Sequence, residues 1–293
     1  MSEEESRPVK KKLGLWTSTS LVVGNMIASG VFLLPASLAV YGGISIFGWL
    51  FTATGAMILA YIFASLSRVV PGTGGPYIYT RVGFGDLPGF LVAWGYWLSI
   101  LAGNAAIAVA FVGYAGVFWP PLSSVPLLSA IGSITAIWVL TWVNSRGVRE
   151  AGLVQLVTTL LKILPLILVG LFGLFYFDFS HFTPFNPSGQ SNLSAFSATA
   201  ALTLWAFLGL ESATIPAEEV QNPDRTIPKA TIFGTGFAAL VYIVSTVAVM
   251  GLIPASDLAQ STAPFAQAAS QLWGPWAGYF VAAGAAISCL GGL

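Results

Sequence analysis

Long apolar runs alternate with short polar connections along this chain. Each run is about 20 residues or longer, the length that a helix needs to cross a bilayer, and is too long for a strand of a membrane barrel. We count about eight such runs, and each is expected to be a helix: 13–39, 43–67, 87–118, 125–144, 153–177, 193–215, 230–253 and 265–293. The pattern therefore predicts an all-α, polytopic membrane protein.

Basic residues are confined to alternate connections. Ten of the eleven Lys and Arg residues lie in the N-terminal tail, 1–12, or after the second, fourth and sixth runs: Arg7, Lys10, Lys11, Lys12, Arg68, Arg81, Arg146, Arg149, Arg225 and Lys229. Cytoplasmic connections of membrane proteins carry an excess of Lys and Arg. We therefore expect a multi-pass protein of the cell (plasma or inner) membrane, with the tail 1–12 in the cytoplasm.

Composition agrees with a membrane protein and excludes several other classes. Of the 293 residues, 56% are hydrophobic and 8% are charged, against about 25% charged residues in soluble domains. The net charge is zero, so nucleic-acid binding has no basis. The chain has a single histidine, His181, and a single cysteine, Cys289. No catalytic set or metal-ligand spacing is visible, and we expect neither an enzyme nor a bound metal or cofactor.

Two apolar runs contain stretches that would interrupt a helix. They read "GNMIASGVFLLP" at 24–35 and "FLGLESATIPAEE" at 207–219. A broken helix survives in a membrane only where it is buried in protein or lines a cavity, and interruptions at corresponding places in two halves indicate an inverted-repeat transporter. The halves would be 13–177, with spans one to five, and 193–293, with spans six to eight. For the first stretch alone, close helix packing by small residues is an equally good explanation.

Two charged residues lie inside apolar runs. Glu211 is in the second interrupted stretch, and Lys162 is near the middle of run 153–177. Ionisable residues within a span are costly and usually mark a substrate or ion pathway. The alternatives are a structural ion pair or a protonated acid for Glu211, and for Lys162 a side chain that reaches the membrane interface.

Several motifs in order resemble one known family. They read "GNMIASGVFLLPASLAVYGGISIFGW", "PGTGGPYIYTRVGFG", "YWLSILAGNAAI", "TLWAFLGLESATIPAEEVQNPDRTIPKAT" and "GLIPASDLA". These stretches resemble the amino acid-polyamine-organocation superfamily of amino acid permeases, and among its members the bacterial arginine/agmatine and lysine/cadaverine antiporters. The resemblance implies two inverted five-helix repeats plus two further helices. Of those twelve spans this chain would hold about eight, so we expect it to be a piece of a longer protein that does not transport alone.

The resemblance also implies a substrate site between the two interruptions. Backbone donors at the first would hold a substrate carboxylate, which agrees with the free N–H groups and positive dipole at a helix start. At the second, Trp205 would close over the substrate, although an interfacial tryptophan is a rival explanation. The substrate-binding residues implied are Asn25, Met26, Ile27, Ser29, Gly30, Tyr96, Ser99, Ile100, Asn104, Ile107, Trp205, Leu208, Gly209 and Glu211.

A family signature follows the second apolar run. It reads "GTGGPYIY" at 72–79, where Gly74 and Gly75 permit a tight turn. The resemblance places Tyr77, together with Trp205, at a gate. An ordinary Gly-Pro loop with interfacial tyrosines is the alternative, and it suits Tyr79 better than Tyr77.

Lys162 departs from the pattern of the antiporters, which have an apolar residue there. Other members of the superfamily place a lysine at this point, in the space that sodium fills in sodium-coupled relatives. A buried lysine can bind and release a proton, so Lys162, with Glu211, is a candidate for proton coupling. The function predicted first is exchange of basic amino acids or amines by alternating access. The alternatives are proton-coupled symport of neutral amino acids and a receptor or scaffold that transports nothing.

The expected partners follow from these alternatives. An amino acid or amine substrate and the lipid bilayer are expected in the first two cases. Protons and a second copy of the chain, as a homodimer, are left open.

Overall fold

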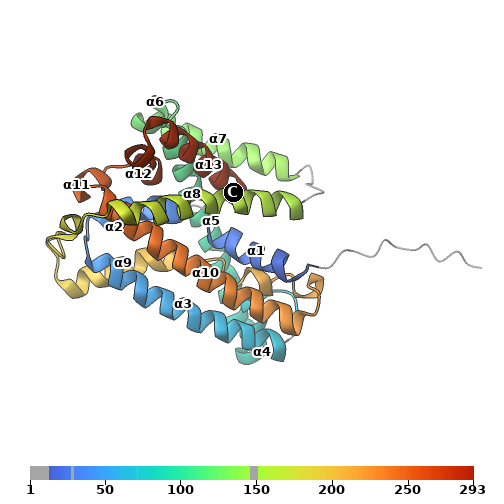
Figure 1. The fold of residues 1–293 in the computed structure, drawn as a ribbon. Coiled ribbons are helices and arrows are strands. Elements are labelled where there is room, and N and C mark those ends of the chain that lie inside the picture. The colour runs from blue at the N-terminus through green and yellow to red at the C-terminus, as the bar shows by residue number, and fades with distance from the viewer. Residues whose placement is uncertain (1–12, 28–29, 71, 146–150) are drawn as a thin grey trace, which may run out of the picture.

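Helices account for the regular structure of the chain. The computed structural model describes residues 13–27, 30–70, 72–145 and 151–293, and Figure 1 shows their course. The tail 1–12 with its four cations, and the cations Arg146 and Arg149, lie outside the described residues. The cytoplasmic position that the sequence predicts for these cations stays a prediction.

The α-helices follow the apolar runs, and short helices occur in some connections. They are α1 Leu15–Met26, α2 Gly30–Ala39, α3 Ile44–Val69, α4 Pro76–Phe84, α5 Asp86–Ala115, α6 Pro121–Ser124, α7 Pro126–Ser145, α8 Ala151–Gly173, α9 Asn192–Trp205, α10 Pro223–Leu252, α11 Ala255–Leu258, α12 Pro264–Trp273 and α13 Pro275–Gly292. Four 3₁₀ turns complete them: η1 Leu174–Tyr176, η2 Phe179–Phe182, η3 Ser212–Thr214 and η4 Ala217–Glu219. The last run, 265–293, is not the single helix expected, because it is divided at Gly274, whose φ is +92°, into two helices.

Four helical stretches among the described residues are long and apolar enough to cross a membrane. They are Leu15–Ala39, which joins α1 and α2, Ile44–Val69, Asp86–Ala115 and Pro223–Leu252. Shorter apolar helices occur at Pro126–Trp142 and Lys162–Tyr176. The protein is therefore all-α and polytopic, while the count of about eight spans stays a prediction.

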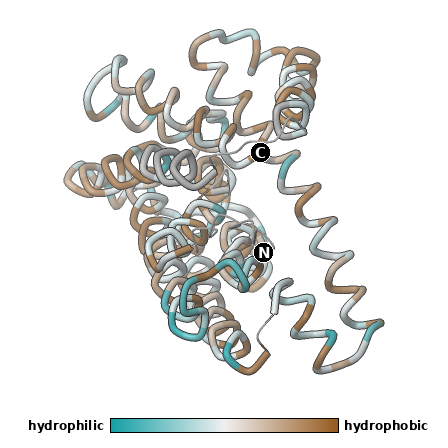
Figure 2. Tube along the Cα trace, turned by 90° about the vertical axis from the view of Figure 1, so that its right-hand side faces the viewer, coloured by the Kyte–Doolittle hydropathy of each residue, from teal (hydrophilic) through white to brown (hydrophobic). Residues whose placement is uncertain are grey.

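The outer surface of the helices is strongly hydrophobic. Phe51, Trp94, Trp138 and Phe233 each expose more than half of their surface, and Figure 2 shows many hydrophobic positions along the helices. Soluble monomers rarely expose apolar patches of this extent. These side chains are suited to contact with lipid.

The interior of the bundle is built from small residues in close contact. On α3 the buried positions Gly48, Thr52 and Ala56 recur at helical spacing. A Cβ at Gly48 would lie 2.6 Å from the Thr199 hydroxyl of α9, and the hydroxyl of Thr52 donates to that of Thr203 at 2.9 Å. Small residues let helix backbones approach, and such contacts hold helices together in lipid.

Helix α10 occupies a central position. It packs against α1, α3 and α8, whereas α13 packs against α5, α8 and α12 (Figure 1). Helix α1 also contacts η3. This arrangement brings the end of α1 to the segment that follows α9.

Both predicted interruptions fall between helices. Helix α1 ends at Met26 and α2 begins at Gly30, so the first span consists of two half-helices. Helix α9 ends at Trp205 and α10 begins at Pro223, with η3 and η4 between them.

Candidate functional site

The two interruptions are in direct contact with each other. Gly209 has a φ of +103°, a backbone conformation that favours glycine. A Cβ there would lie 3.1 Å from the backbone of Asn25 and Met26. In addition, the Asn25 side-chain amide donates to the Ser212 hydroxyl at 2.8 Å. Residues far apart in the sequence are therefore fixed against each other at this point.

A cavity of about 260 Å³ opens beside this contact. Its walls come from the end of α1, the middle of α5, the segment after α9 and the end of α13. The lining residues are Asn25, Met26, Tyr96, Ser99, Ile100, Gly103, Asn104, Ile107, Trp205, Ala206, Leu208, Gly209, Glu211, Ser212 and Gly292. The wall mixes aliphatic side chains with a few polar groups, as is usual for small-molecule sites.

Glu211 supplies the carboxylate of the cavity. Its side chain is 7% exposed, and its Oε2 accepts the backbone N–H of Gly209 at 3.1 Å. The Tyr96 side chain, from α5, also interacts with this carboxylate. A carboxyl group here is buried, held in place by the backbone N–H of Gly209 and directed at a cavity. Such an arrangement is suited to an ammonium group.

Aromatic and aliphatic groups line the rest of the site. Trp205 is the last residue of α9 and lies partly buried at the wall, next to the half-exposed Leu208. Helix α5 contributes Ile100, Ile107 and Asn104. An alkyl chain would contact the aliphatic groups, and the Asn104 amide can bond a polar end.

Of the fourteen residues predicted to bind substrate, eleven line this cavity. Ile27 does not line it and is fully buried in the hydrophobic core. Gly30 begins α2, and its role at the site stays a prediction. Ser29 lies outside the described residues.

Sequence reasoning missed four lining residues: Gly103, Ala206, Ser212 and Gly292. Ser212 follows Glu211 directly, so a hydroxyl beside an intramembrane carboxylate was a usable signal. Gly292 comes from the end of α13. Nothing in its local sequence indicates that it reaches the cavity.

Lys162 lies behind the first interruption and outside the cavity wall. Its side chain is fully buried, so it does not extend to the membrane interface. Its Nζ donates to the carbonyl of Gly24 at 3.4 Å. Gly24 belongs to the last turn of α1, where carbonyl groups lack partners within the helix. The ammonium group therefore lies at the negative end of the α1 dipole.

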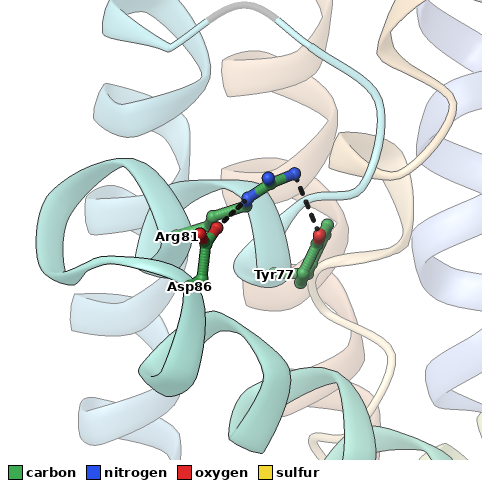
Figure 3. A network of polar contacts seen from close by, with 3 residues as sticks. All are labelled: Tyr77, Arg81 and Asp86. Carbon is green, nitrogen blue, oxygen red and sulfur yellow. Dashed lines mark hydrogen bonds and ion pairs between the residues drawn. The ribbon is translucent and has the colours of Figure 1, made fainter.

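Tyr77, the predicted gate residue, lies in α4 and is not part of the cavity wall. Figure 3 shows its hydroxyl accepting from Arg81 Nη1 at 3.3 Å, while Arg81 Nε contacts Asp86 at 2.7 Å. The hydrogen bond and charge of Asp86 raise the pKa of Arg81 above its ordinary value. Both partners of this pair are substantially exposed, and such surface pairs stabilise little.

The glycines before Tyr77 nevertheless touch the second interruption. The Gly74 N–H donates to the carbonyl of Ile215 at 3.2 Å. Gly75 has a φ of +51°, and a Cβ there would lie 2.5 Å from the Thr214 hydroxyl. The tight turn predicted for these glycines is present, and it packs against η3.

Comparison with known proteins gives a consistent result. The family described as amino acid permease matches residues 13–293. The cadaverine/lysine antiporter of Escherichia coli (strain K12) is 39% identical over 284 residues, 96% of this chain and 63% of that protein. The putrescine transporter of the same strain is 37% identical over 289 residues, 98% of this chain and 66% of that protein. A putrescine transporter of Haemophilus influenzae is 36% identical over 283 residues, 96% of this chain and 65% of that protein.

These matches cover almost the whole chain, while the chain spans about two thirds of each relative. The interruptions, the cavity and the intramembrane charges all lie within the matched region. A family match of this extent is decisive for classification. The chain belongs to the amino acid permease family.

Proposed function

We propose that the protein exchanges cationic amino acids or linear diamines across a membrane by alternating access. The observation that carries this proposal is the Glu211 carboxylate, buried at the meeting point of two interrupted helices and directed at a cavity of about 260 Å³. A buried carboxylate without a cation is costly, and a cationic substrate removes that cost on binding. The site is therefore selective for a positive charge.

The remaining lining groups suit the rest of such a molecule. Cadaverine, lysine and putrescine appear in the names of the relatives, and each is an alkyl chain with an ammonium group at one or both ends. One ammonium group would contact Glu211, with Trp205 covering it through its ring face. The alkyl chain would lie along Ile100 and Ile107, and Asn104 would face the far end.

An amino acid substrate needs a second site for its carboxylate. The start of α2 at Gly30 provides N–H groups that have no partner within the helix, at the positive end of its dipole. We place the substrate carboxylate there, with Ser29 and Ile27 as neighbours in sequence. Tyr77 and Trp205 would act as gates on either side.

The arrangement in the membrane is part of the same proposal. Residues 13–177 and 193–293 would be two inverted repeats, the second incomplete, with the N-terminal tail in the cytoplasm. The positive-inside pattern of the connections supports this orientation. In the described structure, the Leu13 N–H donates to the Glu219 carbonyl at 2.8 Å, so the segment after the tail lies beside the connection after the sixth run.

A second candidate is proton-coupled symport of neutral amino acids. It is favoured by Lys162, a fully buried ammonium group hydrogen-bonded to the first interruption. Loss of a proton from Lys162 would remove its charge, weaken its hydrogen bond to the Gly24 carbonyl and loosen the end of α1. That change would couple proton movement to the shape of the site.

Uptake into liposomes separates these candidates. The complete protein is reconstituted with and without unlabelled amino acid inside, and labelled lysine, putrescine, leucine and alanine are followed with and without an inward proton gradient. Exchange predicts that lysine or putrescine enters only preloaded vesicles, and that Glu211→Ala abolishes uptake. Glu218→Ala is the matched control, because Glu218 is exposed in η4.

Three other outcomes would count against exchange. Entry of leucine or alanine without preloading, driven by the proton gradient and made independent of it by Lys162→Ala, would establish symport. Lys229→Ala, which changes an exposed lysine of α10, is the control for that variant. Conductance without saturation would indicate a channel. No movement of any solute by the complete protein would indicate a receptor or scaffold.

A further inference from the structure

Tyr114 joins three helices through a single oxygen atom. It lies in the last turn of α5 and is fully buried. Its hydroxyl donates to the carbonyl of Phe32, in α2, at 2.9 Å. The same oxygen accepts the backbone N–H of Phe265, in α12, at 3.4 Å. The hydroxyl thus uses its donor and an acceptor position on two different helices.

One of the two backbone partners lies where a helix lacks an internal hydrogen-bond partner. In α2, Pro35 removes the N–H that would bond to the Val31 carbonyl, so Phe32 is next to that missing bond and not part of it. Phe265 is in the first turn of α12, whose N-cap residue Ala263 provides no side-chain acceptor. Tyr114 therefore supplies an acceptor to an N–H group that has no partner within α12, and a donor to a carbonyl of α2.

Aromatic packing reinforces the same junction. The ring of Phe32 makes edge contacts with the rings of Tyr114 and Phe265, each with centroids 5.7 Å apart and planes at 76°. Such edge-to-face pairs are favourable beyond simple burial. Next to Tyr114, a Cβ on Gly113 would lie 2.5 Å from the carbonyl oxygen of Thr262. Close packing at Gly113 therefore fixes the end of α5 against the residues that precede α12.

The junction lies between the first interruption and the helices that follow α10. Helix α2 is the half-helix directly after that interruption, and it packs against α5, α11 and α12 (Figure 1). Tyr114 itself is not a lining residue of the cavity. Ile107, two turns earlier on α5, is one. Movement of α2 would therefore be transmitted to α5 and α12 without contact between Tyr114 and substrate.

We propose that Tyr114 is a positioning residue that makes α2, the end of α5 and α12 move as one body during the transport cycle. The inference rests on the proposed function, exchange by alternating access. In this view α12 and the end of α5 follow α2 as the site opens and closes. Without the hydroxyl, α2 and α12 lose their common partner and move separately.

Tyr114→Phe tests this, because it removes the hydroxyl and keeps the ring. Tyr242→Phe is the matched control: Tyr242 is also fully buried among rings, and its hydroxyl has no hydrogen-bond partner among the described residues. Exchange rates are divided by the number of substrate-binding sites, so a smaller folded fraction of a variant does not lower the rate that is compared. We expect Tyr114→Phe to lower turnover at least fivefold and to leave the substrate Kd within twofold. Tyr242→Phe should change both by less than twofold.

A labelling measurement keeps the test independent of transport. Ser37→Cys places a thiol on the exposed face of α2, where it lines a second cavity of about 680 Å³ between α2, α5 and α7. Its rate of reaction with a membrane-impermeant maleimide is measured without substrate, with the Ser37 protein as the blank. We expect Tyr114→Phe to change this rate at least threefold and Tyr242→Phe to leave it unchanged.

The outcomes separate the two proposals. If the unaltered protein exchanges no solute, the proposed function fails, and the labelling rates alone decide whether Tyr114 couples the helices. Where exchange is measurable, equal turnover of Tyr114→Phe and Tyr242→Phe would overturn the role given to Tyr114. Where exchange is not measurable, equal labelling rates of the two variants would overturn it.

Discussion

The two interrupted helices meet at one cavity, yet they are interrupted in different ways. Helix α1 ends at Met26 and α2 begins at Gly30, and the helix then continues through Pro35. After α9, by contrast, the segment 206–222 forms turns and two 3₁₀ helices before α10 begins. The first interruption is a gap inside one span, whereas the second is an unwound segment.

The difference decides what each interruption presents to a ligand. A short gap leaves free backbone groups at two helix ends, and one of them, the Gly24 carbonyl, is already bonded to Lys162. The unwound segment instead brings side chains to the cavity, including Glu211 and Ser212. We infer that the first interruption works through its backbone and the second through its side chains.

The strongest test of this comparison removes one charge from each side. Glu211→Gln keeps the shape of the side chain and loses its charge, so exchange of lysine or putrescine should fall about 100-fold, or about 2.7 kcal/mol. Lys162→Met should keep exchange within about threefold, because its ammonium group bonds a helix end and does not line the cavity. Initial exchange rates in proteoliposomes measure both. A larger loss of exchange for Lys162→Met than for Glu211→Gln would contradict the roles given to the two interruptions.

Gly209→Ala tests how tightly the unwound segment is fixed. With φ at +103° and the backbone of Asn25 at 3.1 Å from a new Cβ, alanine should destabilise the fold by about 2 kcal/mol. Gly55→Ala is the control, because Gly55 lies within α3 with open space around it. That change should leave stability equal or raise it by up to about 1 kcal/mol. Thermal unfolding in detergent compares the variants, and equal melting temperatures would show that the segment adapts easily.

A double-mutant cycle measures the hydrogen bond between the interruptions. Asn25→Ala, Ser212→Ala and the double variant should give a coupling of about 1 kcal/mol in substrate affinity. The control is the hydroxyl pair of Thr52 and Thr203, which are 2.9 Å apart and away from the cavity. That pair should show coupling in thermal stability and none in affinity. Additive effects on affinity at Asn25 and Ser212 would mean that the two interruptions bind independently.

The smallest expected effects come from the two prolines. Pro35 lies inside α2, so Pro35→Ala restores an N–H to the helix and should raise stability by about 0.5 kcal/mol. Pro216 lies in the unwound segment, with φ −89° and ψ 43°. Pro216→Ala should lower stability by a similar amount, about 0.5 kcal/mol, because the unfolded chain gains freedom. The free energy of unfolding in denaturant measures both variants. If it changed in the same direction for both, the structural difference between the two sites would be contradicted.

Much of the fold was predictable because its signals are local. Apolar runs of sufficient length predicted helices, and the small residues and prolines predicted where two helices are interrupted. The resemblance to a family extended this to the site, and residues such as Asn25, Tyr96 and Glu211 do lie around one cavity. The same resemblance implied that Ile27 lies at the site. The structure shows that its side chain is directed into the core.

Other features had no local signal. Gly292 reaches the cavity from the end of α13, and its sequence gives no reason for this. The motif assigned Tyr77 to a gate, and this stays a prediction: its hydroxyl accepts from Arg81, and nothing in the local sequence indicates that contact. The role of Tyr114 depends on carbonyl and amide groups of two distant helices. A single sequence does not encode such pairings in a form that can be read directly.

The sequence by itself determined that this protein is a bundle of apolar helices with two interruptions and two internal charges. Those features depend on the length, hydrophobicity and backbone freedom of neighbouring residues. Only the tertiary structure decided that Gly209 touches Asn25, that Lys162 bonds the end of α1, and that α2, α5 and α12 share one hydroxyl. The reason is physical: a helix in lipid fixes its own backbone bonds, whereas the bonds freed at an interruption are satisfied by whichever distant groups the packing of helices brings near.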